Sequence, residues 1–429
     1  MKTYARYKDS GISWIGDVPE HWTCLKIKRL FDEDDEKNEN GEFELLSFSK
    51  NKGLIYYKDN NEKEPSAGDL TKYRVVHKGQ LLENRMQAWH GMFICVDKEG
   101  CVSPDYSVFN ANKRTVGSVK YYEYCFRLPM WVQQFANESR GIGDGFNRLY
   151  TSQFHKIMAI VPPLSEQKTI AEYLDKKTAQ INELVSAKQK QIELLKEYKQ
   201  SIIANAVTGK LDERTGSRPT DERREKRKWK DSGISWIGKI PENWEVDKLG
   251  HRFIQRKEKV SDKDYPPLSV SKMGVTPQLE SACKTDDGDN RKLVLKGDFV
   301  VNSRSDRKGS CGLSELDGSV SLINIVATPR NIDGHYIHYL FRSNNYIEEF
   351  YRMGRGIVAD LWTTRWSEMR TIMIPVPPLS EQKEIVAYIE KKVSSIDFQI
   401  VSIENQIANL NEYKQSLISD VVTGKVKVC

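Results

Sequence analysis

The stretch that decides the fold is Pro377-Pro378-Leu379-Ser380-Glu381-Gln382-Lys383, because the chain contains the same seven residues earlier, from Pro162 to Lys168. The two copies are 215 positions apart. Further matches follow at the same shift: Glu197–Ser201 with Glu412–Ser416, and Thr208–Lys210 with Thr423–Lys425. Identical flanks at one constant shift predict that a long segment has been duplicated. The alternative is two unrelated amphipathic core helices, which would not explain the matching ends.

The segment between these flanks carries a heptad pattern, most clearly in its second copy. Spacings that alternate between four and three residues place the apolar side chains on one face of a helix, the pattern that pairs helices along their length. In the first copy Lys188 breaks one row, and Thr178 and Lys199 dilute the other. We therefore predict two homologous long helices that pair as an antiparallel coiled coil with pseudo-two-fold symmetry. The predicted pairing residues are Leu174, Ile181, Val185, Ile192, Leu195, Ile202, Ile389, Val393, Ile396, Ile400, Ile403, Ile407, Leu410 and Leu417.

Both predicted helices have recognisable ends. A pair of prolines precedes each helix, and acidic residues occupy the first turn. Ser165 and Ser380 can serve as N-caps, since a serine hydroxyl accepts a hydrogen bond from a free amide of the first turn. Gly209 and Gly424 can end the helices, because glycine readily adopts the left-handed conformation that follows many last turns.

A second repeat marks the start of each half. Residues 8–22 read KDSGISWIGDVPEHW, and residues 230–244 read KDSGISWIGKIPENW, at a shift of 222. The glycines, the proline and the two tryptophans predict an aromatic-anchored loop before a first strand, with a structural packing role in preference to direct ligand contact. Fainter matches continue through each half, and their shift falls to 218 and then 215. This pattern indicates one scaffold that carries two different surfaces.

The predicted fold class is α+β, with two homologous mixed α/β domains in tandem, each followed by a long helix. Short alternating or apolar runs bounded by Gly, Asp and Asn predict several strands per half. Residues 126–136 and 336–353 are predicted to be helical. A charge-dense stretch between the halves predicts an exposed linker, and a basic DNA-contacting tail is the alternative. The predicted boundaries are 1–161 for the first domain, 162–210 for the central helix, 211–228 for the linker, 229–376 for the second domain and 377–429 for the C-terminal helix.

Composition narrows the classes of protein. The chain has 429 residues and a net charge of +6, which permits a nucleic-acid partner without demonstrating one. No apolar run approaches the roughly 20 residues of a membrane span, and the first residues lack a signal-peptide pattern. Seven cysteines without a CxxC pair fit a reducing compartment better than a disulfide scaffold. We therefore expect a cytoplasmic protein.

The sequence carries few of the motifs that mark catalytic sites. The sequence contains neither a Walker A loop nor an HExxH motif. Residues 141–145 resemble a cofactor-binding glycine loop, but the repeated segment 356–360 loses two of the three glycines. His335 and His338 could share a metal ion, although no second pair supports the site. We predict no catalytic residue, no metal site and no cofactor bound by this chain, and instead a binding protein with two sites.

Candidate contact residues lie where the two halves differ, next to shared anchors. Arg, Lys, Asn and Gln side chains can bond to base edges and to phosphates of DNA, and each could equally be a solvated surface side chain. In the first half the candidates are Lys50, Asn51, Lys52, Asn84, Arg85, Gln87, Arg148 and Tyr150. In the second half they are Lys272, Asn302, Arg304, Arg307, Lys308, Arg355 and Arg365.

As a set, the PPLSEQK segments, the TGK ends and the GISWIG…PExW starts resemble the specificity subunit of type I restriction–modification systems, over essentially the whole chain. The resemblance implies that each recognition domain reads one half of a split, asymmetric site in double-stranded DNA. It also implies that the helices act as a ruler and dock two methyltransferase subunits, which use S-adenosylmethionine. Two motor-nuclease subunits, which use ATP with Mg²⁺, can join. The chain itself would catalyse nothing.

Three alternatives remain open on the sequence. One is a fused restriction–modification enzyme, which the missing methyltransferase and nuclease motifs disfavour. Another is a scaffold that binds only proteins, which the differing loops between constant anchors disfavour. The third is an orphan subunit that pairs with the methyltransferase of another system.

Overall fold

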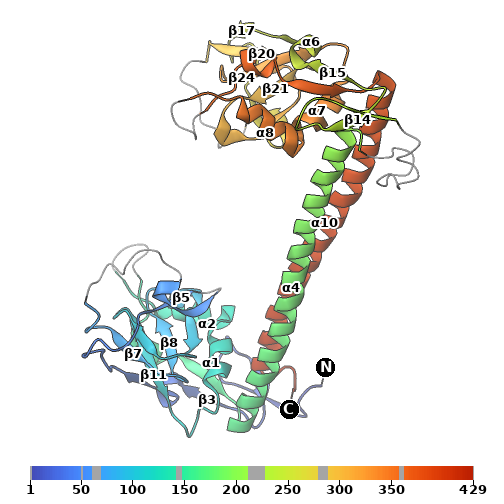
Figure 1. Cartoon of the computed structure of the whole chain (residues 1–429). Helices are drawn as coiled ribbons and strands as arrows, with labels where there is room; N and C mark the ends of the chain where they lie inside the picture. The colour runs from blue at the N-terminus through green and yellow to red at the C-terminus, as the bar shows by residue number, and fades with distance from the viewer. Residues whose placement is uncertain are drawn as a thin grey trace. The chain divides into compact units, whose positions relative to one another are not determined.

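The computed structural model describes residues 2–49, 52–59, 69–141, 147–210, 228–278, 288–356 and 362–428 (Figure 1). The chain divides into two compact units. Unit 1 comprises Met1–Lys188 and Asn405–Cys429, and unit 2 comprises Gln189–Glu404. Each unit therefore contains one α/β domain and a part of each of two long helices. Most of the predicted linker, residues 211–227, lies outside the described residues.

The α/β domain of unit 1 is built on a four-stranded antiparallel sheet. Its strand order is β4 (Phe31–Asp34), β11 (Tyr106–Ala111), β8 (Leu81–Asn84) and β9 (Phe93–Cys95). The two-stranded pairs are β1 (Tyr7–Asp9) with β2 (Asp17–Pro19), β3 (Thr23–Lys26) with β12 (Met158–Val161), β5 (Leu46–Ser49) with β6 (Gly53–Tyr56), and β7 (Arg74–Val76) with β10 (Gly100–Val102). The helices are α1 (Val119–Phe126), α2 (Pro129–Glu138) and α3 (Thr151–Phe154), with short 3₁₀ turns η1 (Ile27–Arg29), η2 (Tyr57–Asp59) and η3 (Ala88–His90).

Alternation along the strands divides the side chains of this sheet between two cores. Phe93 and Phe109 join the aromatic core that includes Phe126, Phe135 and Phe154 of the three helices. On neighbouring strand positions, Leu82 and Val108 belong instead to a second core with residues of the β5–β6 hairpin. Successive side chains of a strand point to opposite faces, so one sheet serves both cores.

The α/β domain of unit 2 repeats this plan. The sheet order is β16 (Phe253–Gln255), β24 (Asn324–Pro329), β21 (Phe299–Asn302) and β22 (Cys311–Leu313). The smaller sheets are β13 (Trp229–Asp231) with β14 (Lys239–Pro241), β15 (Glu245–Lys248) with β25 (Met373–Val376), β18 (Leu268–Ser271) with β19 (Gly274–Pro277), and β17 (Lys259–Val260), β20 (Arg291–Val294) and β23 (Gly318–Val320) together. The helices are α6 (Leu249–Arg252), α7 (Gly334–Arg342), α8 (Asn344–Arg352) and α9 (Trp366–Met369), with the 3₁₀ turn η4 (Ser305–Arg307).

The predicted helices at 126–136 and 336–353 are wrong in their extent. In unit 1 a helix ends at Phe126 and a new one begins at Pro129, because proline disfavours a helical conformation in the residue before it and Leu128 is extended. In unit 2 the extended Ser343 separates two helices, and its hydroxyl accepts a hydrogen bond from the amide of Tyr346. Each predicted single helix is therefore part of a helix pair.

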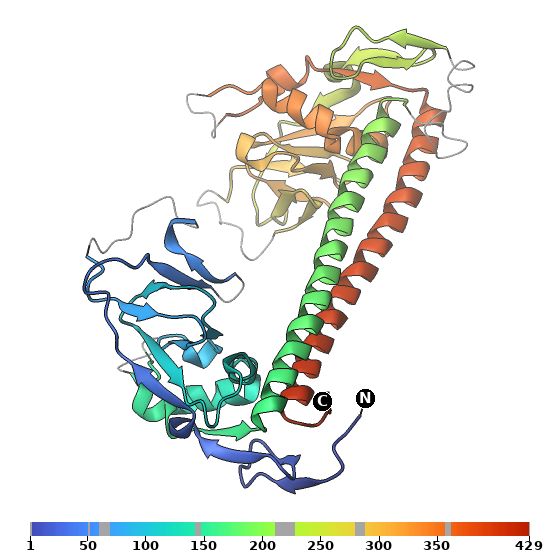
Figure 2. The ribbon, with the colours of Figure 1, turned by 60° about the horizontal axis from the view of Figure 1, so that its bottom comes forward.

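The two long helices are α4 (Leu164–Val207) and α10 (Leu379–Val422), each of 44 residues (Figure 1; Figure 2). The prediction that Gly209 and Gly424 end them is confirmed, since the two glycines have φ of 73° and 76°. The N–H of Lys210 then donates to the carbonyl of Asn205 at 2.8 Å, which closes the last turn. An added Cβ on Gly209 would lie 2.5 Å from Cδ of Pro241.

The prediction of N-caps at the two serines of the PPLSEQK segments is wrong, because Ser165 and Ser380 lie inside the first helical turn. The glutamine two positions later ties the helix to its domain instead. Nε2 of Gln167 donates to the carbonyls of Thr115 and Pro162, both at 2.9 Å, and its Oε1 accepts the N–H of Gly117 at 2.8 Å. Gln382 makes the equivalent bonds to Pro377 and Asp333 in unit 2. Both glutamines are buried.

The long helices contact each other within each unit. In unit 1, Nζ of Lys414 donates to Oδ1 of Asn182 at 2.9 Å, and Lys188 donates to Gln406. Rising residue numbers on one helix thus match falling numbers on the other, which is an antiparallel arrangement within this unit. In unit 2, Nζ of Lys199 lies 2.7 Å from a carboxylate oxygen of Asp397. Lys188 and Lys199, which interrupt the apolar rows, therefore find polar partners on the other helix.

The predicted pairing residues are all at least partly shielded from solvent. Nine are buried and five are half-buried. The buried ones are Leu174, Ile181, Ile192, Ile202, Ile389, Ile396, Ile400, Ile403 and Leu417, and the half-buried ones are Val185, Leu195, Val393, Ile407 and Leu410. Among the described residues, no helix is apolar over enough of its length to cross a membrane.

The repeated segments at 8–22 and 230–244 form short hairpins whose tryptophans anchor them. Trp22 and Trp244 are fully buried. Nε1 of Trp22 donates to Oε2 of Glu166 at 3.0 Å, at the start of α4. In unit 2, the amide of Asn243 donates to Glu381 at the start of α10, also at 3.0 Å. The predicted structural role of these segments is confirmed, and each joins its domain to the start of a long helix.

Candidate functional site

The candidate contact residues of unit 1 gather where β8 ends and where α3 begins. The N–H of Leu149 donates to the carbonyl of Arg85 at 3.0 Å, which places the segment before α3 against the end of β8. Nε of Arg85 donates to the carbonyl of Asp105 at 3.3 Å, and Nη2 of Arg148 lies 3.0 Å from the carboxylate of Asp105. The structure therefore brings both arginines together, around one acidic residue. Tyr150, beside them, is 44% exposed.

The side chains of two candidate residues, Asn84 and Asn302, are hydrogen-bonded to the backbone. Oδ1 of Asn84 accepts the N–H of Met86 at 3.1 Å, and Oδ1 of Asn302 accepts the N–H of Arg304 at 3.2 Å. Each asparagine is the last residue of the corresponding strand of its domain, where the chain turns. Their presence in both halves is explained by this turn, since an asparagine side chain commonly bonds to a backbone amide two residues on.

The remaining candidates of unit 1 lie apart from this group or outside the described residues. Gln87 is exposed just before η3. Lys52 is exposed directly before β6. Lys50 and Asn51 fall outside the described residues. The structure thus brings together Arg85, Arg148 and Tyr150, and leaves Lys52 on a separate hairpin.

The candidate cations of unit 2 are partly neutralised by acidic neighbours. Nε of Arg304 donates to Oδ1 of Asp306 at 2.9 Å, and Nε of Arg307 lies 3.6 Å from Oδ2 of the same carboxylate. Nζ of Lys308 lies 3.1 Å from the carboxylate of Glu348. Arg355 is exposed and pairs through its backbone with Thr363. Lys272 is exposed at the turn between β18 and β19.

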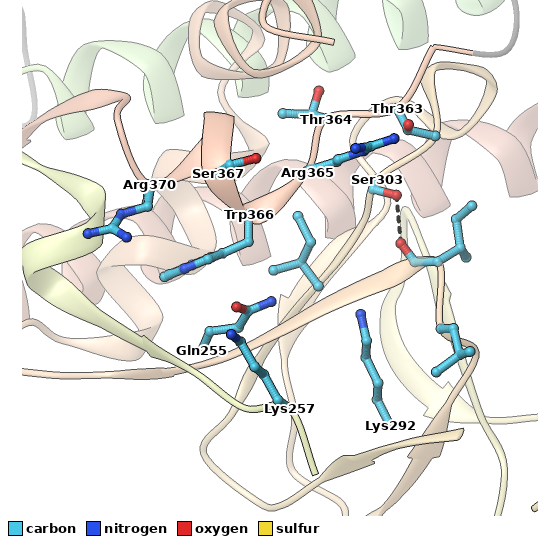
Figure 3. Close-up of a pocket in the computed structure, with 13 residues that line it drawn as sticks. Gln255, Lys257, Lys292, Ser303, Thr363, Thr364, Arg365, Trp366, Ser367 and Arg370 are labelled. Atoms are coloured by element: carbon cyan, nitrogen blue, oxygen red, sulfur yellow. Dashed lines mark hydrogen bonds between the residues drawn. The ribbon is translucent and has the colours of Figure 1, made fainter. Parts of the chain in front are cut away.

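A cavity of about 640 Å³ opens between the sheet of unit 2 and the segment that leads into α9. Figure 3 shows Lys257, Lys292, Arg365 and Arg370 around this space, together with Trp366. We call it the α9 pocket. Among the described residues that line it there is no carboxylate, and none of the four cations forms an ion pair within the described part of the chain.

Lys292 is the most enclosed of the four cations. It comes from β20, is half-buried, and donates from Nζ to the carbonyl of Asn324 at 2.6 Å. Burial lowers the pKa of its ammonium below the usual value, because a charged group loses hydration there. A negatively charged ligand in the pocket would therefore gain a poorly solvated cation as a partner.

Only Arg365 of this pocket is among the residues singled out from the sequence. Lys257, Lys292 and Arg370 were missed, as was Trp366. Lys292 lies on β20 and Trp366 begins α9, whereas Lys257 lies between β16 and β17 and Arg370 follows α9. No local motif marks them. A comparison of the two halves could have found Lys257, Trp366 and Arg370, since the first half holds Asp35, Thr151 and His155 there, whereas Lys292 corresponds to another cation, Arg74.

Comparisons with known proteins agree with the motifs. Residues 8–194 match the family model of the type I restriction modification DNA specificity domain. The chain is 23% identical over 452 residues to a putative type I restriction enzyme MjaX specificity subunit of Methanocaldococcus jannaschii, with 96% of each chain covered. It is 24% identical to the type I restriction enzyme EcoBI specificity subunit of Escherichia coli, with 62% of this chain and 58% of that protein covered.

The likeness to type I restriction enzyme specificity subunits thus covers residues 8–194 by the family model and nearly the whole chain by the Methanocaldococcus relative. Solved structures show that the fold of this chain is shared. A chain from a structural study of complex assembly and conformational transition of the type I restriction–modification system superposes with a TM-score of 0.67, at 14% identity over 95% of this chain and 99% of that one. The HsdS subunit of Thermoanaerobacter tengcongensis gives a TM-score of 0.55, at 14% identity over 95% and 98%.

Burial shifts the pKa of several titratable side chains in this chain. Burial raises the pKa of the Cys95 thiol to about 11, which disfavours the thiolate. Burial also lowers the pKa of His338 to about 4. Within the described ranges, no group of three or more His, Cys, Asp or Glu side chains could hold a metal ion.

Proposed function

We propose that this chain acts as a specificity subunit that reads a split, asymmetric DNA site, one half with each α/β domain. The observation that carries the proposal is one scaffold with two different surfaces. The bond from Leu149 to Arg85 in unit 1 recurs as the bond from the N–H of Thr364 to the carbonyl of Ser303 in unit 2, at 3.0 Å in both. The side chains at these equivalent positions differ. Two different surfaces on one scaffold favour two different half-sites, and so a site without palindromy.

The residues proposed to contact DNA are those that the two domains do not share. Arg85, Arg148 and Tyr150 form the candidate group in unit 1. Arg304 and Arg365 lie at the corresponding edge of unit 2. Arginine suits such a role, because its guanidinium can bond in pairs to guanine edges and to phosphates.

We propose further that α4 and α10 pair as an antiparallel coiled coil that sets the distance between the half-sites. A helix of 44 residues is about 66 Å long, at about 1.5 Å per residue. Half-sites read from one face of B-DNA have centres about 34 Å apart, or multiples of that. The helices are therefore long enough to fix such a spacer and still offer surface to partner subunits.

The helices carry exposed apolar side chains that suit the proposed docking of two methyltransferase subunits. In unit 2, Phe398 is 76% exposed and Val401 is 53% exposed on α10, and Leu194 is 55% exposed on α4. In unit 1, Leu184 is 52% exposed. Exposed apolar groups on a helix face favour a protein partner. Two motor-nuclease subunits could join the same assembly.

The proposed role is recognition without catalysis. S-adenosylmethionine would be bound by the methyltransferase subunits, and ATP with Mg²⁺ by the motor-nuclease subunits, so that this chain holds no cofactor. The described cysteines Cys24, Cys95, Cys101, Cys125 and Cys311 are free thiols, in line with the predicted cytoplasmic location.

The test is to co-express this chain with the methyltransferase of its system in a host without adenine methylation, and to map N6-methyladenine across the genome. A split, non-palindromic motif that disappears when this chain is omitted is the expected result. Methylation that is unchanged by its omission would contradict the proposal.

A matched pair of variants separates reading from scaffolding. Arg85→Ala removes a candidate contact from unit 1, and Arg304→Ala removes one from unit 2. Each is expected to weaken DNA binding by the assembled complex. If neither has an effect while the methyltransferase stays bound, the chain acts as a scaffold that binds only proteins.

A further inference from the structure

The α9 pocket has an exact positional counterpart in unit 1, which the shared backbone identifies. Thr363 pairs through its backbone with Arg355, as Arg148 pairs with Arg140 in unit 1. Strands β16 and β21 correspond to β4 and β8 in four-stranded sheets of the same order, and β20 pairs with β23 as β7 pairs with β10. Lys292 therefore corresponds to Arg74.

Charge distinguishes the two places. The α9 pocket is lined by four cations and no described carboxylate, which gives a formal charge of +4. The thirteen corresponding residues of unit 1 include three arginines and three acids, which sum to 3 − 3 = 0. In chain order these six are Glu33, Asp35, Arg74, Arg85, Asp105 and Arg148.

The charges of unit 1 neutralise one another by contact. Nη1 of Arg74 lies 3.0 Å from Glu33, and its Nη2 lies 3.3 Å from Asp35. Arg148 is paired with Asp105 at 3.0 Å. The two acids that pair with Arg74, Glu33 and Asp35, correspond to Gln255 and Lys257 in unit 2. Lys292, the counterpart of Arg74, therefore has no acid at either of these two positions. An anion approaching this place in unit 1 meets acids, whereas the residues that line the α9 pocket include four cations and no carboxylate. The nearby carboxylate of Glu368 accepts hydrogen bonds from the N–H of Arg365 and the hydroxyl of Ser367.

We infer that the α9 pocket of unit 2 takes a phosphodiester group of the DNA backbone, and that its counterpart in unit 1 does not. The inference rests on the proposed DNA-reading function and deepens it. Phosphate is the anion that DNA offers wherever it lies against a protein, and a contact to it positions the duplex without reading sequence. Lys292 supplies an enclosed donor at the base of the pocket, and Lys257 and Arg370 supply further cations around it.

If the pocket binds phosphate, the two domains should contribute unequally to the affinity for DNA and to its salt dependence. Each phosphate contact releases counterions from DNA, so that the logarithm of affinity falls with the logarithm of salt by about 0.9 per contact. The α9 pocket should therefore contribute to the salt dependence of binding and to affinity for any sequence. The same surface of unit 1 should contribute little to either quantity.

The experiment uses the full chain assembled with its methyltransferase subunits, and two fluorescent duplexes, one with the mapped recognition site and one without it. Lys257→Gln and Arg370→Gln each remove an exposed pocket cation whose side chain makes no ion pair among the described residues. Lys239→Gln, on β14, is the matched control, because it removes the same charge from an exposed position of unit 2 outside the pocket. Fluorescence anisotropy gives Kd between 50 and 200 mM salt.

Each pocket variant is expected to weaken binding to both duplexes by the same factor. The slope of log affinity against log salt should become shallower by about 0.9. When salt rises fourfold, the loss of affinity should therefore be about 3.5-fold smaller for the variant than for the wild type. Lys239→Gln should leave the slope unchanged. The reciprocal variant, Glu33→Gln with Asp35→Lys, copies the residues of unit 2 into unit 1 and should steepen the slope.

Other outcomes overturn the inference in recognisable ways. A loss confined to the duplex with the site, at an unchanged slope, would mean that the pocket reads a base. Unchanged DNA binding together with a loss of inorganic phosphate binding in calorimetry would assign the pocket to a free anion. If the wild-type complex shows no preference for the mapped site, the proposed reading function fails, whereas the slope on the site-free duplex still decides whether the pocket binds phosphate.

Discussion

The buried glutamine of the PPLSEQK segment provides the sharpest test of how each domain holds its long helix. In Gln167→Met, an apolar side chain of similar length replaces one that makes three short hydrogen bonds, at 2.9, 2.9 and 2.8 Å, and accepts a longer one from the N–H of Ser118 at 3.4 Å. Each such bond contributes about 1 kcal/mol net, so local opening of the start of α4 should become easier by about 3 kcal/mol. Since 1.4 kcal/mol is a factor of ten, amide exchange there should accelerate by about 100-fold.

Hydrogen–deuterium exchange of the assembled complex measures this effect, because it reports the opening of individual segments. Peptides that cover residues 162–175 are the readout. Gln382→Met removes two such bonds, at 2.7 Å each, and should accelerate exchange at the start of α10 by about 30-fold. Gln191→Met, at an exposed position of α4, is the control and should change nothing there. Exchange in Gln167→Met as slow as in this control would refute the view that the glutamine ties the helix to the domain.

Three further predictions follow from the same structure. Deletion or addition of one helical turn near Ala187 should change the spacer of the methylated motif and leave the half-site sequences unchanged; an unchanged spacer would argue against the ruler. Gly209→Ala, with φ of 73° and a clash with Pro241, should destabilise unit 2 by more than Gly233→Ala, where φ is 72° and the space is open; equal shifts in unfolding temperature would count against the contact. Glu83 is fully buried, its carboxylate oxygens find no partner among the described residues, and burial raises its pKa well above the usual value. Since its folded pKa exceeds the unfolded value, stability is lost as pH rises from about 4.3 toward the folded pKa. Glu83→Val, which copies Val301 of unit 2, should therefore stabilise unit 1 more at pH 7 than at pH 4, and a gain that does not depend on pH would contradict this account.

The features that could be predicted from the sequence are those encoded by neighbouring residues. The duplication is visible as repeated segments. The long helices follow from their heptad spacing, and their ends follow from Gly209 and Gly424, whose conformational freedom is a property of glycine itself. The anchoring role of Trp22 and Trp244 could be predicted because large aromatic side chains gain most from burial. The helix breaks were within reach too, since Pro129 disfavours a helical Leu128 whatever the tertiary structure.

Tertiary structure alone decided which polar groups meet. Lys257, Lys292 and Arg370 come from separate elements, and only the sheet brings them around one cavity. Arg74 is as basic as its counterpart Lys292, yet it is neutralised by two acids that the fold places beside it. The sequence by itself determined the repeated scaffold, because helix periodicity, turn geometry and aromatic burial act over short stretches of chain. The fold decided the electrostatic character of each domain, because the charge that a ligand meets depends on partners distant in sequence.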